Sequence, residues 1–165
     1  MFSDALIQLA ATVLDEARTK GVMIATAESC TGGLIAGLLT EIPGSSDVVE
    51  RGFVTYSNEA KADLLGIPLS LIQDNGAVSE VVARAMAEGA VQKSLAQVSV
   101  AVTGIAGPGG GSAEKPVGLV HMAAAREDGV TLYEEHRFGD IGRTEVRLAT
   151  VEAALKLVRK QLAQP

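Results

Sequence analysis

Short, almost entirely apolar runs alternate along this chain with longer segments of helical periodicity. The runs 22–27 (VMIATA) and 98–102 (VSVAV) carry no charge and are too short for buried helices, which is typical of strands covered on both faces. A further strand is expected at 52–56. Helices are expected at about 4–20, 31–41, 58–65, 80–95 and 143–162, with a short turn of helix near 69–74. The alternation predicts an α/β fold of three layers, with helices on both faces of a mixed, mostly parallel sheet.

A hairpin is expected late in the chain. Segments 117–126 and 130–138 have strand character and flank Glu127–Asp128–Gly129, a turn sequence. No linker, repeat or low-complexity stretch interrupts the 165 residues, so we predict one domain over 1–165. Aromatic residues make up only 3% of the chain and Trp is absent. The core must therefore be built from Ala, Val, Leu and Ile.

Charge and cysteine content limit the classes of partner. The net charge of −6 and the scarcity of aromatic rings disfavour nucleic acid as a partner. Cys30 is the only cysteine, so a disulfide within the chain is impossible and a reducing compartment is expected. The charged N-terminal segment is unlike a signal peptide, and no stretch of about 20 apolar residues is present. We predict a soluble, cytoplasmic protein with no membrane partner.

Ser29 lies where a buried strand is expected to give way to a helix, in the turn Glu28–Gly33 (ESCTGG). Ligands commonly bind at that edge of an α/β sheet, and unpaired N–H groups at a helix start can stabilise developing negative charge. Gly32 and Gly33 would let a substrate approach the backbone. Cys30 is a second candidate nucleophile, but no histidine neighbours it in sequence. For this turn alone, a helix cap by Ser29 or Thr31 is the commoner explanation.

A base for Ser29 is offered by the next strand and helix. Tyr56 is expected to end the strand and Lys61 to lie in the first turn of the helix, so both would lie near the same sheet edge as Ser29. A lysine becomes a base when burial lowers its pKa. His121 and His136 fall in the predicted hairpin without an obvious carboxylate partner, which disfavours a Ser–His–Asp arrangement. The alternative is a solvated lysine beside a tyrosine at the edge of the core.

Two features suit an anion. The loop Thr103–Gly111 (TGIAGPGGG) can turn several N–H groups toward one, although it matches neither a Walker A motif nor a dinucleotide fingerprint. Arg143 and Arg147 share one helix face at i, i+4 spacing, so their two guanidinium groups together suit a phosphate or carboxylate. The alternatives are a flexible connecting loop, and surface pairing of these arginines with Asp140 or Glu145.

Five stretches together resemble the CinA C-terminal domain family. They are 26–33 (TAESCTGG), 51–61 (RGFVTYSNEAK), 76–80 (GAVSE), 103–118 (TGIAGPGGGSAEKPVG) and the GD, R and VR positions of 139–147. The resemblance extends over nearly the whole chain. It implies a stand-alone nicotinamide-nucleotide amidase, which hydrolyses the carboxamide of nicotinamide mononucleotide to nicotinate mononucleotide and ammonia in pyridine-nucleotide recycling. Longer family members carry an additional molybdopterin-binding-like domain, whose pyrophosphatase activity we do not expect here.

The resemblance also implies the roles of individual residues. Ser29 would be the nucleophile and Lys61 its base, with Tyr56 beside them. The substrate contacts would come from Cys30, Thr31, Gly32, Thr103, Gly104, Gly107, Gly109, Arg143 and Arg147. Neither a metal nor a cofactor is expected, and a homo-oligomer, dimer or larger, is implied. The sequence does not distinguish Arg143 from Arg147 as the phosphate ligand. The alternative is a non-catalytic nucleotide-binding module, or an interaction module related to competence or DNA damage.

Overall fold

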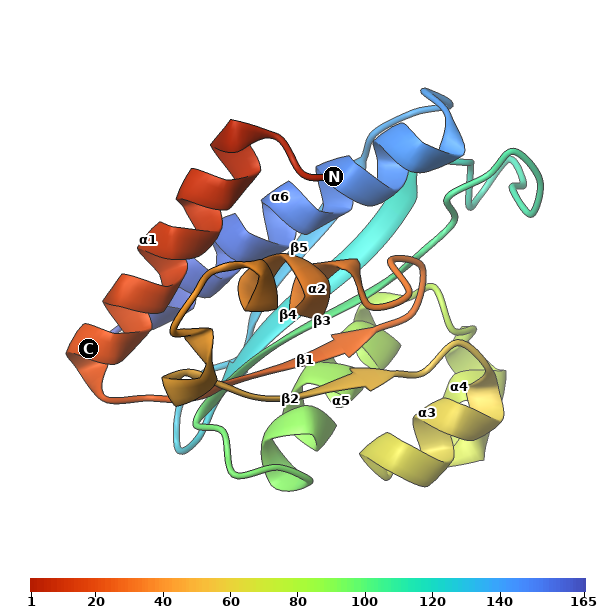
Figure 1. Cartoon of the computed structure of the whole chain (residues 1–165). Helices are drawn as coiled ribbons and strands as arrows, with labels where there is room; N and C mark the ends of the chain where they lie inside the picture. Colours follow the sequence, from red (N-terminus) through yellow and green to blue (C-terminus); the bar gives the residue numbers. More distant parts are fainter.

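The computed structural model describes all 165 residues as a three-layer α/β fold (Figure 1). The predicted succession of helices and strands is confirmed, with one short 3-10 helix added. The elements are α1 (Asp4–Lys20), β1 (Ile24–Glu28), α2 (Leu34–Glu41), η1 (Ser45–Asp47), β2 (Val49–Val54), α3 (Asn58–Leu65), α4 (Leu69–Asn75), α5 (Glu80–Gln92), β3 (Val98–Gly104), β4 (Leu119–Arg126), β5 (Leu132–Arg137) and α6 (Arg143–Leu162).

The five strands form one sheet in the order β2-β1-β3-β4-β5. β1 pairs in parallel with β2 and with β3, whereas β3–β4 and β4–β5 are antiparallel, so only β4 runs against the other strands. The sheet is therefore mixed and mostly parallel, as predicted. Glu28 at the end of β1 lies opposite Val54 and Val102, so the carboxyl ends of β1, β2 and β3 share one edge.

Two apolar cores lie on opposite faces of the sheet. The larger one joins the sheet to α1, α2 and α6, and includes Leu14, Leu38 and Leu155. The smaller one lies under α3, α4 and α5, and includes Leu65, Ile72 and Met86. Figure 1 shows the two helical layers on either side of the strands. Side chains at the carboxyl edge can therefore be held from both layers.

Most helix ends follow the capping rules. Ser3 Oγ accepts the N–H of Leu6 at 3.2 Å, and Gly21 ends α1 in the left-handed region at φ 66°. The cap of α3 is Ser57, whose Oγ accepts the Ala60 N–H at 3.0 Å. Asn58 is the first helical residue, one position further on.

Two boundaries near the site differ from prediction. α2 begins at Leu34, not near Thr31, because Gly32 and Gly33 adopt φ values of 58° and 104°, outside the helical region. β2 covers Val49–Val54, earlier than the predicted 52–56, so Tyr56 follows the strand instead of ending it. The Thr55 N–H still bonds to Glu28 O at 2.9 Å, which keeps this segment beside β1.

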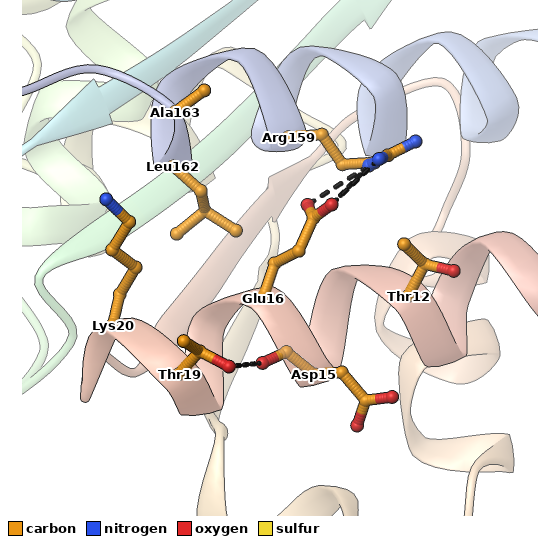
Figure 2. A pocket seen from close by; sticks show the side chains of 8 residues that line it. All are labelled: Thr12, Asp15, Glu16, Thr19, Lys20, Arg159, Leu162 and Ala163. Carbon is orange, nitrogen blue, oxygen red and sulfur yellow. Dashed lines mark hydrogen bonds and ion pairs between the residues drawn. The ribbon is translucent and has the colours of Figure 1, made fainter.

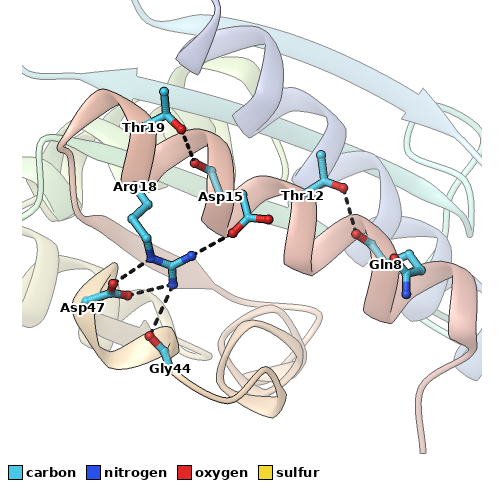
Figure 3. A network of polar contacts seen from close by, with 7 residues as sticks. All are labelled: Gln8, Thr12, Asp15, Arg18, Thr19, Gly44 and Asp47. Carbon is cyan, nitrogen blue, oxygen red and sulfur yellow. Dashed lines mark hydrogen bonds and ion pairs between the residues drawn. The ribbon is translucent and has the colours of Figure 1, made fainter.

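A surface network fixes α1 to the turn before β2 (Figure 3). Arg18 donates to both carboxylate oxygens of Asp47, at 2.7 and 2.9 Å, and to the Gly44 carbonyl at 3.3 Å. It also pairs with Asp15 at 2.8 Å. These groups are exposed, so the network contributes little to stability. None of the helices combines the length and the apolar character that crossing a bilayer requires.

Candidate active site

Ser29 and Lys61 meet at the carboxyl edge of the sheet. Lys61 Nζ lies 3.1 Å from Ser29 Oγ and donates to the Thr55 carbonyl oxygen at 2.9 Å. Ser29 follows β1, and Lys61 lies in the first turn of α3. α3 and α2 cover opposite faces of the sheet. The two residues are 32 positions apart in sequence. The predicted juxtaposition of serine and lysine is present in the structure.

Lys61 is buried to an unusual degree for a lysine. Only 1% of its surface is exposed. Its two hydrogen bonds go to a hydroxyl and to a backbone carbonyl, and neither involves a carboxylate. Burial lowers the pKa of Lys61 below its ordinary value of 10.5, because a charged ammonium loses its hydration there. A lysine with a lowered pKa is more readily neutral and can accept a proton from the adjacent hydroxyl.

A buried carboxylate holds the loop that carries Ser29. Glu28 is fully buried and accepts three hydrogen bonds, from the Thr31 hydroxyl at 2.6 Å, the Ile35 N–H at 2.8 Å and the Ala36 N–H at 3.1 Å. The N-terminal N–H groups of α2 are therefore occupied. Our expectation that they would face developing negative charge is wrong, because Glu28 already neutralises that helix end.

Cys30 is poorly suited to act as the nucleophile. It is 6% exposed and belongs to the larger apolar core. Burial raises the pKa of its thiol to about 12. The reactive thiolate is therefore scarce at neutral pH, and Ser29 remains the better candidate.

A cavity of about 260 Å³ opens beside Ser29. The glycine-rich loop forms much of its wall through Gly104, Ile105, Ala106, Gly107, Gly109 and Gly110, with Ser29, Cys30, Tyr56 and Arg143 completing it. Arg143 donates to the Gly107 carbonyl at 2.7 Å and to the Tyr56 hydroxyl at 3.2 Å. Tyr56 is 65% exposed and makes no hydrogen bond to Ser29 or Lys61. It therefore forms part of the cavity wall, and its participation in proton transfer remains a prediction.

Four other predicted contact residues lie outside this cavity lining. The Thr103 hydroxyl donates to Ala77 O at 2.9 Å, and Thr31 is fully buried against Glu28. Gly32 lies beside Arg147, since a Cβ added there would be 3.3 Å from Nη2. Arg147 donates from Nε to Cys30 O at 3.1 Å and from Nη2 to Thr31 O at 3.0 Å. Neither arginine forms the surface ion pair with Asp140 or Glu145 that was the alternative.

The histidines lie elsewhere in the hairpin. His136 Nε2 is 2.7 Å from Glu134 Oε2, so the expectation that neither histidine has a carboxylate partner is wrong. The pair is formed by alternate residues on one face of β5, a spacing that brings side chains together in a strand. His121 Nδ1 is 2.6 Å from the Tyr133 hydroxyl, and burial lowers the pKa of His121. Neither histidine makes a hydrogen bond to Ser29.

A second cavity, of about 420 Å³, lies between α1 and α6 (Figure 2). It is lined mainly by exposed polar side chains, and Arg159 spans it to pair with Glu16 at 2.7 Å. It lies near the C-terminus of α6, about 25 Å along the helix from Arg143 at 1.5 Å per residue. It therefore does not share the chemistry of Ser29. No group of three or more His, Cys, Asp and Glu side chains is arranged to bind a metal ion.

Glu28 is the structural residue of this site that sequence reasoning missed. It is the only charged residue of a strand whose five positions are all buried. A single carboxylate in such a run, directly before a serine and a glycine pair, was an available signal. Its partners on α2 could not be predicted, because they depend on how the loop folds back.

The fold and this site define a class: three-layer α/β proteins with a serine–lysine pair at the carboxyl edge of the sheet and a glycine-rich loop beside it. Within that class, the chain belongs to the CinA C-terminal domain family, which it matches over residues 6–162. The predicted resemblance is thereby confirmed.

Relatives and solved structures agree with this assignment. A putative competence-damage inducible protein of Caldicellulosiruptor bescii is 50% identical over 87% of this chain, and a CinA-like protein of Synechococcus sp. is 51% identical over 93%. The chain spans about a third of the length of these relatives, 34% and 37%. The crystal structure of the competence/damage inducible protein CihA from Agrobacterium tumefaciens is 56% identical, covers 99% of each chain and superposes with a TM-score of 0.95. A CinA superfamily protein of Escherichia coli is 30% identical, with 98% and 94% coverage and a TM-score of 0.89.

Proposed function

We propose that this protein is an amidohydrolase that removes the carboxamide nitrogen of nicotinamide mononucleotide, yielding nicotinate mononucleotide and ammonia. The observation that carries the proposal is the buried Lys61 Nζ at 3.1 Å from Ser29 Oγ, with burial lowering the pKa of the lysine. The family assignment adds the substrate class through the resemblance described above.

The first chemical step forms the acyl-enzyme. Ser29 Oγ attacks the amide carbon as its proton passes to neutral Lys61, and the carbonyl electron pair moves onto oxygen. The Ser29–carbon bond forms, and the tetrahedral intermediate then re-forms its carbonyl. The carbon–nitrogen bond breaks as Lys61 returns the proton to nitrogen, and ammonia leaves.

The second step restores the enzyme. Water attacks the acyl carbon and gives its proton to Lys61, which protonates Ser29 Oγ as the ester bond breaks. Nicotinate mononucleotide leaves as the carboxylate. Throughout, the Thr55 carbonyl holds Nζ in place, since that bond is independent of the serine. No step requires a metal ion.

The phosphate of the substrate would be held by the outer part of the cavity. Arg143 is exposed and lines the cavity together with Gly109 and Gly110. The N–H groups of Gly109 and Gly110 have no acceptor within the chain, so an anion can bind them. In accord with the family resemblance, we also propose that the protein is a homo-oligomer and acts in the cytoplasm.

The decisive experiment measures ammonia release from nicotinamide mononucleotide by wild type, Ser29→Ala and Lys61→Ala without added metal. We expect turnover by wild type and a loss of about 10³-fold or more in both variants. Lys61→Arg is a companion variant that keeps a long cationic side chain, and it should also be inactive because arginine does not give up its proton. A folded wild type that binds the nucleotide without releasing ammonia would instead support a non-catalytic binding module.

A further inference from the structure

The backbone carbonyls of Ser29, Cys30 and Thr31 all accept hydrogen bonds from donors within the chain. Ser29 O accepts the Gly32 N–H at 3.1 Å, and Thr31 O accepts the Leu34 N–H at 3.1 Å. Arg147 adds a bond to Thr31 O and the only bond to Cys30 O. The guanidinium therefore joins two successive peptide units of the loop to α6, 116 residues further along the chain.

The N–H groups of the same loop are not all occupied. Those of Cys30, Thr31 and Gly33 have no acceptor in the chain. Thr31 is fully buried, which removes its N–H from any ligand, whereas Cys30 lines the cavity next to Ser29. In a trans peptide the N–H is opposed to the preceding C=O, so fixing Ser29 O fixes the direction of the Cys30 N–H. Gly33 lies outside the cavity lining, so the Cys30 N–H is the unoccupied donor of this loop that an oxyanion in the cavity can reach.

The loop is held from two sides. On one side, the Glu28 carboxylate accepts hydrogen bonds from the Thr31 hydroxyl and from the first N–H groups of α2. Arg147 binds the carbonyls of Cys30 and Thr31 from α6. Gly32 packs against Arg147, so the guanidinium also fills the space beside the left-handed turn.

Arg143 and Arg147 therefore differ in what they face. Arg143 is exposed and lines the cavity. Arg147 is half-buried, lies outside the cavity lining and donates two hydrogen bonds to carbonyls of the Ser29 loop. Both were predicted as substrate contacts from their shared helix face.

We propose that Arg147 is a positioning residue, which holds the Ser29–Thr31 backbone so that Ser29 Oγ and the Cys30 N–H act together on the scissile carbonyl. The substrate anion is bound by Arg143. This inference rests on the proposed function, since it assumes that Ser29 attacks an acyl carbon.

The experiment compares two substrates in wild type, Arg147→Lys, Arg143→Lys and Arg159→Lys. Nicotinamide mononucleotide carries a phosphate, whereas p-nitrophenyl acetate is neutral and needs only the nucleophile and the oxyanion donor. Lysine keeps the charge of arginine but cannot bridge two carbonyls with a planar fork. Arg159, which pairs with Glu16 at the far end of α6, controls for a general effect on the helix.

For Arg147→Lys we expect kcat to fall about 10- to 100-fold on both substrates, with KM changed less than about threefold, as for a displaced oxyanion donor. Arg143→Lys should raise KM for the nucleotide by a larger factor than it changes either constant for the ester, since the ester carries no anion. Arg159→Lys should match wild type on both. Arg147→Ala should be inactive yet partly rescued by added ethylguanidinium, with thermal unfolding midpoints showing that each variant is folded.

Two results would overturn the role proposed for Arg147 without contradicting the assignment of Ser29 as the nucleophile. One is an unchanged rate of ester hydrolysis in Arg147→Lys while Ser29→Ala is inactive on the ester. The other is a raised KM for the nucleotide with kcat unchanged, which would make Arg147 an anion ligand. A wild type that lacks any Ser29-dependent activity on either substrate would overturn the proposed function, and the inference with it.

Discussion

The Ser29 loop and the glycine-rich loop follow neighbouring parallel strands and reach the same edge of the sheet, yet they are built differently. In the Ser29 loop the carbonyls of Ser29, Cys30 and Thr31 are bonded, Glu28 and Arg147 hold the loop from two sides, and most of its residues are buried. In the glycine-rich loop, Gly109, Gly110 and Gly111 are exposed, and their N–H groups lack acceptors in the chain. The tip is closed by mutual bonds between Ser112 and Lys115, and Lys115 Nζ also donates to Asn75 O at 3.4 Å.

The difference corresponds to two tasks. A nucleophile and its base must keep a separation of about 3 Å, so rigid support on every side favours turnover. A loop that recognises an anion works through unoccupied N–H groups, which need exposure. Substitutions in the first loop should therefore cost more stability than substitutions in the second.

Glu28→Gln should have the largest effect on stability. The amide NH₂ that replaces one carboxylate oxygen cannot accept a hydrogen bond, so either the Ile35 or the Ala36 N–H loses its acceptor and faces another donor. The free energy of unfolding should fall by about 3 kcal/mol. Chemical denaturation measures this loss. The matched control is Glu41→Gln, at the exposed end of the same helix, with an expected change within about 0.5 kcal/mol. Equal stability of the two variants would show that Glu28 does not support the loop.

Lys61→Met should change how stability depends on pH. The lowered pKa means that folded wild type binds fewer protons than the unfolded chain between that pKa and 10.5. Wild-type stability therefore rises with pH in this window, by up to about 1.4 kcal/mol per pH unit, and Lys61→Met lacks that rise. The stability of the variant relative to wild type should be greatest at low pH and shrink toward pH 10.5.

Unfolding midpoints of both proteins from pH 5 to 10.5 test this expectation. A parallel pH dependence would contradict it. In the same window, kcat/KM of wild type should rise with pH as Lys61 loses its proton, because only the neutral amine can accept the Ser29 proton.

Gly110→Ala should have a smaller effect in the glycine-rich loop. Gly110 adopts φ 85°, a left-handed backbone conformation that destabilises an alanine by about 1 kcal/mol. An added Cβ would not clash, since the nearest atom, Ile105 Cγ2, would be 3.8 Å away. Gly109→Ala is the control, since it has no positive φ and no atom within 4 Å of its Cβ position. Equal denaturation midpoints for the two variants would indicate that the loop is free to change conformation without cost.

Cys30→Ala should have the smallest effect on turnover. Its thiol has a pKa raised to about 12 by burial, so the side chain supplies little thiolate, and kcat should stay within about threefold of wild type. Only the Cys30 backbone N–H is assigned to the chemistry, and the substitution retains it. Ammonia-release assays beside Ser29→Ala test this expectation, and a loss as large as that of Ser29→Ala would reassign the nucleophile to Cys30.

Local patterns were sufficient for much of the fold. Periodicity and caps located α1 and α6 closely, because Ser3, Gly21 and the glycine before Arg143 act within one turn of the chain. The same holds for the meeting of Ser29 with Lys61. Each follows a strand whose direction is set by parallel pairing, so both reach one edge.

The sequence by itself determined the layers, the sheet edge and the serine–lysine pair, because these depend on hydrophobic period and on strand polarity. Only the tertiary structure decided the partners of Glu28, Arg143 and Arg147 and the burial of Lys61. Arg143 and Arg147 are indistinguishable on a helical wheel, one turn apart on one face. The loops that pack against α6 separate them, since one meets the glycine-rich loop and the other the Ser29 loop.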